Sequence, residues 1–527
     1  MKLFIYCVVC SLLVTGTVSV AAEDFIGPRR SLATNGAANA MANNVALSPD
    51  GKIEIAIQDA ILLALENNRA LAVQRLQPMI TRTFEAQERA VFDPLLDAQL
   101  SQAATRYQQV SSSSEQIQDL FDRTTYGNLG LSMYLPTGSK IAILGTTTLD
   151  EPPLYSDNFD STRGGISLTQ SLLKGNSIAA NLASLRQARL NTSISEFELR
   201  GFVQQLVADV ETTYWNYTLA WSQIRIFTDS LKLADNQLAE TEERIKVGKL
   251  AKLELYAAQA EVAARKEALI NANSAMEKSR LLLIRLINLP DRTNFWDRGF
   301  VMKNQPFVPE GELEDVALHV AVARKMRPDL NQARLQVQRG DLEVVKTRNG
   351  LLPQMDLFIA LGETGYADSF ARSVKNINAD HYDTTVGLQF EFPPLNRDAR
   401  ARNRRAELSR SSARQALDNL DQLAELDVRT AYIEVQRARE QVTATAVTRQ
   451  LQEKSLQAEQ EKFRVGKSTS LLVAQAERNL LVSQIAEIEA VVTYLKAFVA
   501  LYRLEGSLLD RRGIDAPGKN TVAFNED

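Results

Sequence analysis

Two long segments without helix-breaking residues limit most strongly what this chain can fold into. Residues 176–246 contain one glycine and no proline, and residues 397–463 contain neither. As α-helices with a rise of about 1.5 Å per residue, each would extend roughly 100 Å. Helices of this length exceed an ordinary domain, so the pattern predicts a coiled-coil or tubular assembly rather than a globule.

The two segments are counterparts in an internal duplication. An offset of 218 aligns Tyr214 with Tyr432 and also Val247-Gly248-Lys249 with Val465-Gly466-Lys467, whereas an offset of 259 aligns Pro94 with Pro353. The first copy therefore carries 41 extra residues, the difference between the offsets, between Pro94 and Lys174. We expect a chain made of one structural unit repeated twice, with an insertion in the first copy.

The duplication and its flanks predict the organisation of the chain. Each copy should hold a first helix, at 53–91 or 312–349, then strands, and then a long helical hairpin that ends in 251–288 or 469–506. The expected regions are a signal peptide at 1–22, a flexible lead-in at 23–52, the first structural repeat at 53–290, a linker at 291–311, the second repeat at 312–506 and a C-terminal tail at 507–527.

The N-terminus has the pattern of a secretory signal peptide. A lysine at position 2 precedes an apolar stretch, and Ala21-Ala22-Glu23 supplies small residues for cleavage. Cys7 and Cys10 lie inside this segment, so we interpret them as apolar filler rather than as a redox or metal motif. No later apolar run approaches the ~20 residues that cross a bilayer as a helix.

Strict alternation of apolar and polar residues predicts strands with one apolar face. Such strands, ~9–11 residues long, suit the wall of a membrane barrel, with tight turns on one side and long loops on the other. Polar loops are expected at 109–124, 150–162 and 363–380, and the alternating segments lie at 126–135, 139–149, 166–169, 353–362 and 384–393.

Composition gives no support for catalysis or nucleic-acid binding. The 60 basic and 64 acidic residues nearly cancel, which removes the electrostatic case for nucleic acid. The two histidines, His319 and His381, have no second His or Cys nearby, and no carboxylate pair stands out. Gly466-Lys467-Ser468 lacks the earlier glycine of a phosphate-binding loop, because position 461 is Glu461. We expect no enzyme activity, cofactor or metal.

Five stretches together resemble the TolC-type outer-membrane efflux protein family (outer membrane factor). The resemblance covers residues 53–506 and rests on the order, spacing and duplication of these stretches. They are Ala60 through Asn68, Arg327-Pro328-Asp329-Leu330, Leu168 through Gly175, Arg244 through Gly248, and Phe463-Arg464-Val465-Gly466.

The resemblance implies an α+β membrane protein: a trimeric transmembrane β-barrel continued by a long periplasmic α-helical coiled-coil barrel. It also implies an outer-membrane exit duct in a Gram-negative-type bacterium. Substrate would come from an inner-membrane transporter through a periplasmic adaptor, for efflux or for type I secretion. The alternative is a periplasmic structural coiled-coil protein without a pore.

Lipid does not tolerate bare strand edges, and three copies could close the sheet. Four strands per copy would give 12, and six would give 18. We expect the extra hairpin at 126–149 to join the wall; the alternative is an external or plugging loop.

The resemblance also indicates residues at the periplasmic end. Glu254 matches a gate carboxylate, whereas Phe463 stands where the family often has a gate Tyr. Ser468 stands where the family can have a gate Arg, and Leu472 and Gln475 stand where it can have Asp. Arg464 or Lys467 could pair with Glu254 instead, and an ordinary surface charge is the alternative. The turns expected to bind an adaptor are Val247-Gly248-Lys249 and Val465-Gly466-Lys467.

A basic cluster follows the last predicted strand. Its position suggests the junction between barrel and tunnel, where it would face lipid headgroups or the lumen; salt bridges between packed helices are the alternative. The cluster is led by Arg397, Arg400, Arg402 and Arg404, and continues with Arg405, Arg410 and Arg414.

Overall fold

The computed structural model describes residues 52–110, 117–151, 159–248, 250–288, 295–308, 311, 313–378, 380–519 and 522. The expected signal peptide and all but the last residue of the expected lead-in lie outside these ranges, and so does Lys249 of the first tip turn. The helices and the sheet that follow belong to one compact unit, which begins at Leu47.

Each repeat opens with a short helix and a longer one, separated by a single residue. In the first repeat these are α3 (Ile57–Asn67) and α4 (Arg69–Arg89), and in the second α8 (Val316–Met326) and α9 (Pro328–Asn349). The two segments predicted to be helical, 53–91 and 312–349, are thus each divided into two helices. Asn68 is extended and its side chain accepts a hydrogen bond from the Leu71 N–H, at 3.0 Å, as a helix N-cap. Arg327 is extended because Pro328 disfavours a helical residue before it.

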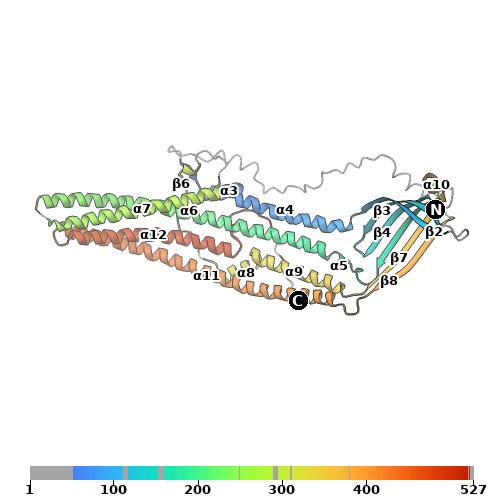
Figure 1. The fold of residues 1–527 in the computed structure, drawn as a ribbon. Coiled ribbons are helices and arrows are strands. Elements are labelled where there is room, and N and C mark those ends of the chain that lie inside the picture. The colour runs from blue at the N-terminus through green and yellow to red at the C-terminus, as the bar shows by residue number, and fades with distance from the viewer. Residues whose placement is uncertain are drawn as a thin grey trace. The chain divides into compact units, whose positions relative to one another are not determined.

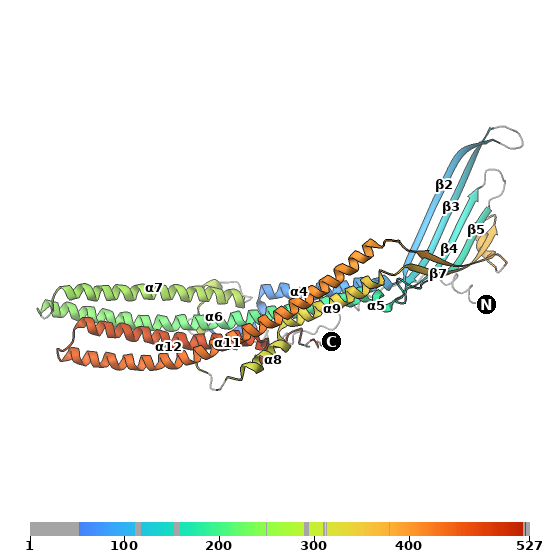
Figure 2. The ribbon, with the colours of Figure 1, turned by 90° about the horizontal axis from the view of Figure 1, so that it is seen from below.

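Two long helical hairpins carry the rest of each repeat. The first consists of α6 (Ala183–Lys246) and α7 (Leu253–Ile287), preceded by the short α5 (Ile178–Asn181); the second consists of α11 (Arg397–Arg464) and α12 (Ser470–Leu504). Figure 2 shows the hairpins lying side by side, with α6 next to α12. Toward the sheet the lateral order is α4, α6, α9 and α11 (Figure 1).

Six antiparallel strands form one sheet. Their order is β2 (Leu95–Val110), β3 (Ile117–Tyr134), β4 (Ser139–Glu151), β5 (Phe159–Ser171), β7 (Gln354–Ala367) and β8 (Tyr382–Glu391). The hairpin predicted at 126–149 is therefore part of the sheet, between β2 and β5. The first repeat contributes four strands and the second contributes two.

Most of the described part of the predicted loops is regular structure. The strands extend into all three loops, and the third also holds helix α10 (Phe370–Lys375), which packs against β5 and β7. The strand segments far from the helices carry polar residues on both faces, so apolar and polar residues do not alternate there. Polar pairs across the hairpin, such as Arg106 with Asp119 at 3.3 Å, stabilise these segments instead.

Smaller elements join the two repeats midway along the long helices. The expected linker contributes η2 (Phe295–Asp297) and β6 (Phe300–Met302), and β6 pairs in parallel with β1 (Ile53–Ile55). The expected tail contains α13 (Leu508–Arg511), whose Leu508 and Leu509 are fully buried. Another 3₁₀ helix, η1 (Ala90–Phe92), leads from α4 to β2. Among helices in the described ranges, none combines the length and hydropathy needed to cross a membrane.

Candidate functional site

The two hairpin tips have the same backbone conformation. Gly248 and Gly466 have φ values of +75° and +76°, a left-handed conformation that favours glycine. Each glycine N–H donates to a carbonyl three residues earlier, at 2.9 and 3.0 Å, which ends the helix. A Cβ at either glycine would meet no described atom within 4 Å. The preceding Val247 and Val465 are exposed, so each tip presents an apolar side chain and an open backbone turn.

Phe463 connects the two tips. The Arg244 guanidinium of α6 lies over the Phe463 ring of α11, 5.2 Å from its centroid, and also contacts Glu240 at 2.5 Å. Phe463 packs as well against a small core formed by Leu456, Val473 and Ala476. A cation–π contact therefore joins the hairpins within one chain, at the position where the resemblance suggested a gate side chain.

Two of the remaining predicted gate residues, Arg464 and Ser468, have local partners. Arg464 pairs with Glu461 one turn earlier, at 2.8 Å. The Ser468 hydroxyl donates to Glu459, which also pairs with Lys462, and both contacts lower the pKa of the Glu459 carboxyl below its ordinary value. Gln475 and Lys467 are exposed, and Glu254 lies in the first turn of α7. Pairing of Glu254 with Arg464 or Lys467 stays a prediction.

A second set of polar contacts binds the hairpins together further from the tips. Glu261 of α7 binds Arg265 one turn later in the same helix, and it also binds Arg478 of α12 at 2.6 Å. Gln237 of α6 donates a hydrogen bond to Glu477 of α12 at 2.5 Å. Burial raises the pKa of the Glu477 carboxyl despite that hydrogen bond. The sequence analysis did not identify these residues, because single charges on long helices carry no pattern that distinguishes a buried pair from a solvated one.

One face of the sheet carries an apolar band near the helices. The register places apolar residues opposite one another on adjacent strands, and the band crosses all six. The other face is polar there, with residues such as Gln99, Ser132 and Gln389. The apolar band consists of Leu96, Ala98 and Leu100 on β2, Leu129, Leu131 and Met133 on β3, Ile141 and Ile143 on β4, Ile166 and Leu168 on β5, Met355, Leu357, Ile359 and Leu361 on β7, and Val386, Leu388 and Phe390 on β8.

The polar face holds an ion pair that spans three strands. Arg163 of β5 binds Asp383 of β8 through two hydrogen bonds, at 2.6 and 2.8 Å. The guanidinium passes over β7 at Gly362, where a Cβ would lie 2.5 Å from it. Glycine at this position therefore lets the arginine cross the intervening strand.

The predicted arginine cluster lies at the start of α11, immediately after the sheet. Arg397, Arg400, Arg402 and Arg404 are all exposed. Arg402 pairs with Asp398 at 3.0 Å and Arg404 with Glu407 at 3.4 Å, both along the helix. Further along α11, Arg410 and Arg414 lie 3.6 and 3.8 Å from Asp341 of α9, so part of the cluster forms ion pairs between packed helices. The role of the cluster at the junction stays a prediction.

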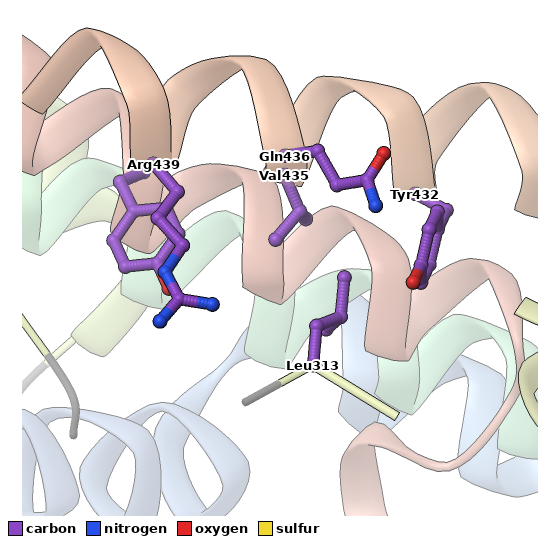
Figure 3. Close-up of a pocket in the computed structure, with 6 residues that line it drawn as sticks. Leu313, Tyr432, Val435, Gln436 and Arg439 are labelled. Carbon is purple, nitrogen blue, oxygen red and sulfur yellow. The ribbon is translucent and has the colours of Figure 1, made fainter. Parts of the chain in front are cut away.

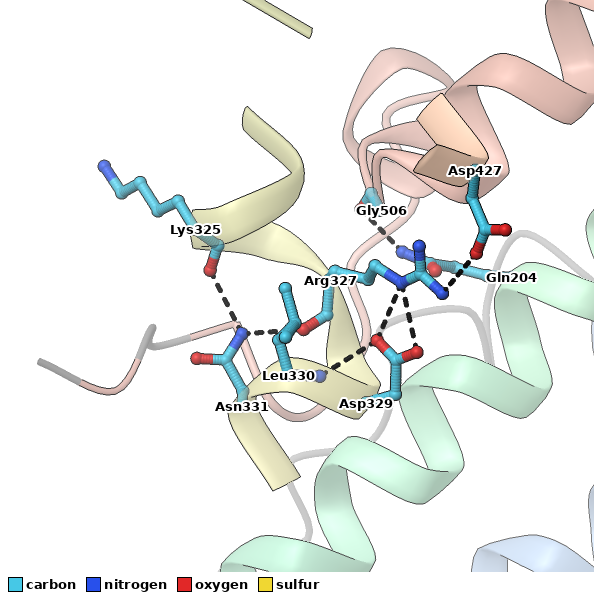
Figure 4. A network of polar contacts seen from close by, with 8 residues as sticks. All are labelled: Gln204, Lys325, Arg327, Asp329, Leu330, Asn331, Asp427 and Gly506. Carbon is cyan, nitrogen blue, oxygen red and sulfur yellow. Dashed lines mark hydrogen bonds and ion pairs between the residues drawn. The ribbon is translucent and has the colours of Figure 1, made fainter. Parts of the chain in front are cut away.

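The corner at Asn68, between α3 and α4, and the corner at Arg327, between α8 and α9, are held by different contacts. Asn68 caps the helix that follows it, whereas Arg327 forms ion pairs. Arg327 binds Asp329 at 2.9 Å and Asp427 at 2.9 Å (Figure 4). Nearby, Gln204 of α6 donates to the Gly506 carbonyl at 2.6 Å, so the second corner is tied to the first repeat.

A hollow of about 220 Å³ lies beside the second repeat (Figure 3). Tyr432, Gln436 and Arg439 of α11 line it, together with Leu313. In the first repeat the counterpart Tyr214 is buried, and its hydroxyl donates to the Ile55 carbonyl of β1 at 3.2 Å. The hollow therefore lies where the second repeat has Leu313 at the position that strand β1 occupies in the first repeat.

The sequence matches the family described as outer membrane efflux protein over residues 60–289 and 320–507. The chain belongs to this family. It is an outer-membrane protein, and the family predicted from the sequence is confirmed.

Similar proteins agree with this assignment. The pyoverdine export outer membrane protein OpmQ of Pseudomonas putida is 25% identical over 333 residues, which cover 62% of this chain and 65% of that relative. The chain thus spans just under two thirds of the relative's length.

Solved structures show the fold. The outer-membrane channel OprN has a TM-score of 0.64 and 17% identity, covering 86% of this chain and 90% of that one. VceC from Vibrio cholerae has a TM-score of 0.63 and 15% identity, covering 85% and 96%.

Proposed function

We propose that three copies of this chain form the outer-membrane exit duct of a tripartite efflux or type I secretion system. One observation carries the proposal. The 64-residue helix α6 joins a sheet with a lipid-compatible face to a hairpin tip about 96 Å away. A passive conduit needs this arrangement, with strands in the outer membrane and helices that cross the periplasm.

The tips are the proposed docking site for a periplasmic adaptor, which would connect the duct to an inner-membrane transporter. Support comes from the repeated geometry: two exposed valines and two open left-handed turns at the end farthest from the sheet. Duplicated tips give six similar sites around a trimer, which suits a ring of adaptor hairpins. The export of pyoverdine by the relative OpmQ makes small molecules the first cargo to test.

Replacing both tip glycines by proline tests the docking role. Proline fixes φ at a negative value and removes the N–H that ends each helix, so the turns must change shape. We expect Gly248→Pro with Gly466→Pro to abolish export in a strain that lacks the native chain, while trimers still form. Gly513→Pro is the matched control, because Gly513 is also left-handed with open surroundings but lies away from the tips. Normal export by the double variant would contradict adaptor docking at the tips.

Conductance in planar bilayers separates the duct from the alternative of a periplasmic structural protein. A trimer purified in detergent should give discrete channel openings. Detergent-independent solubility without any conductance would favour the structural protein.

A further inference from the structure

The sheet and the helical layer end at the same two lateral edges. Among the described strands, β2 and β8 each have one hydrogen-bonded neighbour. β2 follows α4 and β8 leads into α11, and these helices flank the layer beside the sheet. Every residue of β2 is exposed. An unpaired strand edge within lipid is not tolerated, so another chain must cover both edges.

Both flanking helices carry apolar stripes that are at least half exposed. On α4 the stripe has helical spacing, and on α11 it lies opposite the face that packs on α9. The stripes consist of Val73, Leu76, Ile80 and Phe84 on α4, and of Leu408, Leu426, Ile433, Val447 and Leu451 on α11. The two edges of the chain differ, and each needs a partner. A head-to-tail interface between copies of this chain pairs one edge with the other and can close into a ring.

The register of the sheet shows how the copies must meet. A line of paired residues that starts at Ala98, in the middle of the band on β2, crosses the strands and ends at Tyr382 of β8. The middle of the band on β8 is Leu388, six positions further along. The band is therefore oblique to the strands by about one residue per strand. This is the stagger of a barrel whose strands tilt by about 36°, within the usual range for membrane barrels.

The width of the sheet also fits a closed wall that includes all six strands. With strands ~4.8 Å apart and tilted by about 36–40°, six strands occupy about 37 Å of circumference per copy. Four helices at roughly 9 Å spacing occupy about 36 Å. A four-strand sheet would occupy only about 25 Å and would have to taper.

The geometry points to an 18-strand barrel in which β2 of one copy pairs with β8 of the next, with Ala98 opposite the partner subunit's Leu388. This inference rests on the proposed trimer. The band is then level around the whole wall, and the inserted strands β3 and β4 widen the wall until it matches the helical tunnel. A barrel of this size encloses an aqueous channel.

Disulfide cross-linking tests the interface. The only cysteines in the sequence are Cys7 and Cys10, so replacing both by serine gives a cysteine-free background. Opposite residues on paired strands have Cβ atoms about 5 Å apart. Ala98→Cys combined with Leu388→Cys should, on oxidation in membranes, give covalent dimers and trimers with no larger species. Either single-cysteine variant should give at least tenfold less.

The matched control changes only the register. Ala98→Cys combined with Tyr382→Cys uses the same two strands, but the proposed register separates the cysteines by about 20 Å. Cross-linking of this pair at a higher yield than the first would overturn the inference, and so would intact trimers in which neither pair cross-links. Absence of trimers by native mass would instead contradict the proposed function.

Discussion

The two repeats are nearly identical in their helices and different in their strands. The hairpin helices α7 and α12 both have 35 residues, and α3 and α8 both have 11. The first repeat has four strands in the large sheet and the second has two. In the proposed duct, helix length sets the distance from membrane to tip, so unequal hairpins would misalign the tips. Strand number sets only the circumference, which a single insertion can change without disturbing the helices.

The largest expected effect comes from removing this difference. Deleting residues 111–151 removes β3 and β4 and leaves two strands per repeat. The sheet would narrow from about 37 to about 25 Å per copy against an unchanged helical layer. We expect the yield of native trimers in membranes to fall at least tenfold. Trimers at the normal yield would show that the helices can taper onto a narrower wall.

Sequence reasoning predicted the helices better than the sheet, for a physical reason. The absence of helix breakers was enough to predict α6 and α11, and the glycine of each tip recurs at a fixed offset. β2 was missed because its alternation is short. Leu96, Ala98 and Leu100 share one face, but beyond Leu100 polar residues such as Gln102 and Thr105 stand on both faces. The contact of Arg244 with Phe463 could not be predicted, because it joins hairpins that belong to different repeats.

A second comparison concerns the corners at Asn68 and Arg327, which the repeat offset aligns. Arg327→Ala leaves two carboxylates without their partner and should lower the free energy of unfolding by about 2–3 kcal/mol, since the pair is only partly buried. Asn68→Ala removes a helix cap and should cost about 1 kcal/mol. Denaturant midpoints of the purified protein measure both effects.

A conversion variant sharpens the comparison of corners. Arg327→Asn gives the second corner the capping residue of the first, so it should be less destabilising than Arg327→Ala by about 1 kcal/mol. Arg82→Ala, which breaks an exposed pair with Glu196, is the control and should have an effect near zero. Equal losses for the Asn and Ala variants would show that the corners are not interchangeable.

The tip turns should respond equally in the two repeats. Alanine in a left-handed conformation costs about 1–2 kcal/mol. Gly248→Ala and Gly466→Ala should therefore speed hydrogen exchange in the adjoining helix ends to the same extent in the isolated trimer. A clear difference between the two would mean that contacts between copies stabilise one tip and not the other.

The contact between tips should be weaker still. A double-mutant cycle with Arg244→Ala and Phe463→Leu should give a coupling of about 0.5–1 kcal/mol, as for a partly exposed cation–π pair. Phe463→Tyr should retain the coupling because its ring has a similar face. If Arg244→Ala costs the same stability in the Phe463→Leu background as in the native chain, the coupling is zero and Phe463 does not link the hairpins.

The smallest effect depends on pH and arises at Glu477, a partly buried carboxyl of the second repeat. Burial raises the pKa of Glu477, whereas the first repeat has Gln259 at the aligned position. A carboxyl whose pKa is raised on folding contributes stability that is present below its unfolded pKa. That contribution is lost as the pH rises through the folded pKa. Nearby Arg265 opposes the shift and Glu261 adds to it.

Glu477→Gln removes this titration and retains a group that can bind Gln237. The variant and the native chain should therefore have similar thermal midpoints below about pH 4.5, and the variant should become the more stable of the two as the pH rises toward neutrality. The gain should be below about 1 kcal/mol, because the site is only partly buried. Gln259→Glu is the control, because it places a carboxyl at the aligned but exposed position of the first repeat, where no such pH dependence is expected. A native chain that is more stable than Glu477→Gln at pH 7 would show that contacts of the ionised carboxylate with Gln237 and Arg265 outweigh the cost of its burial.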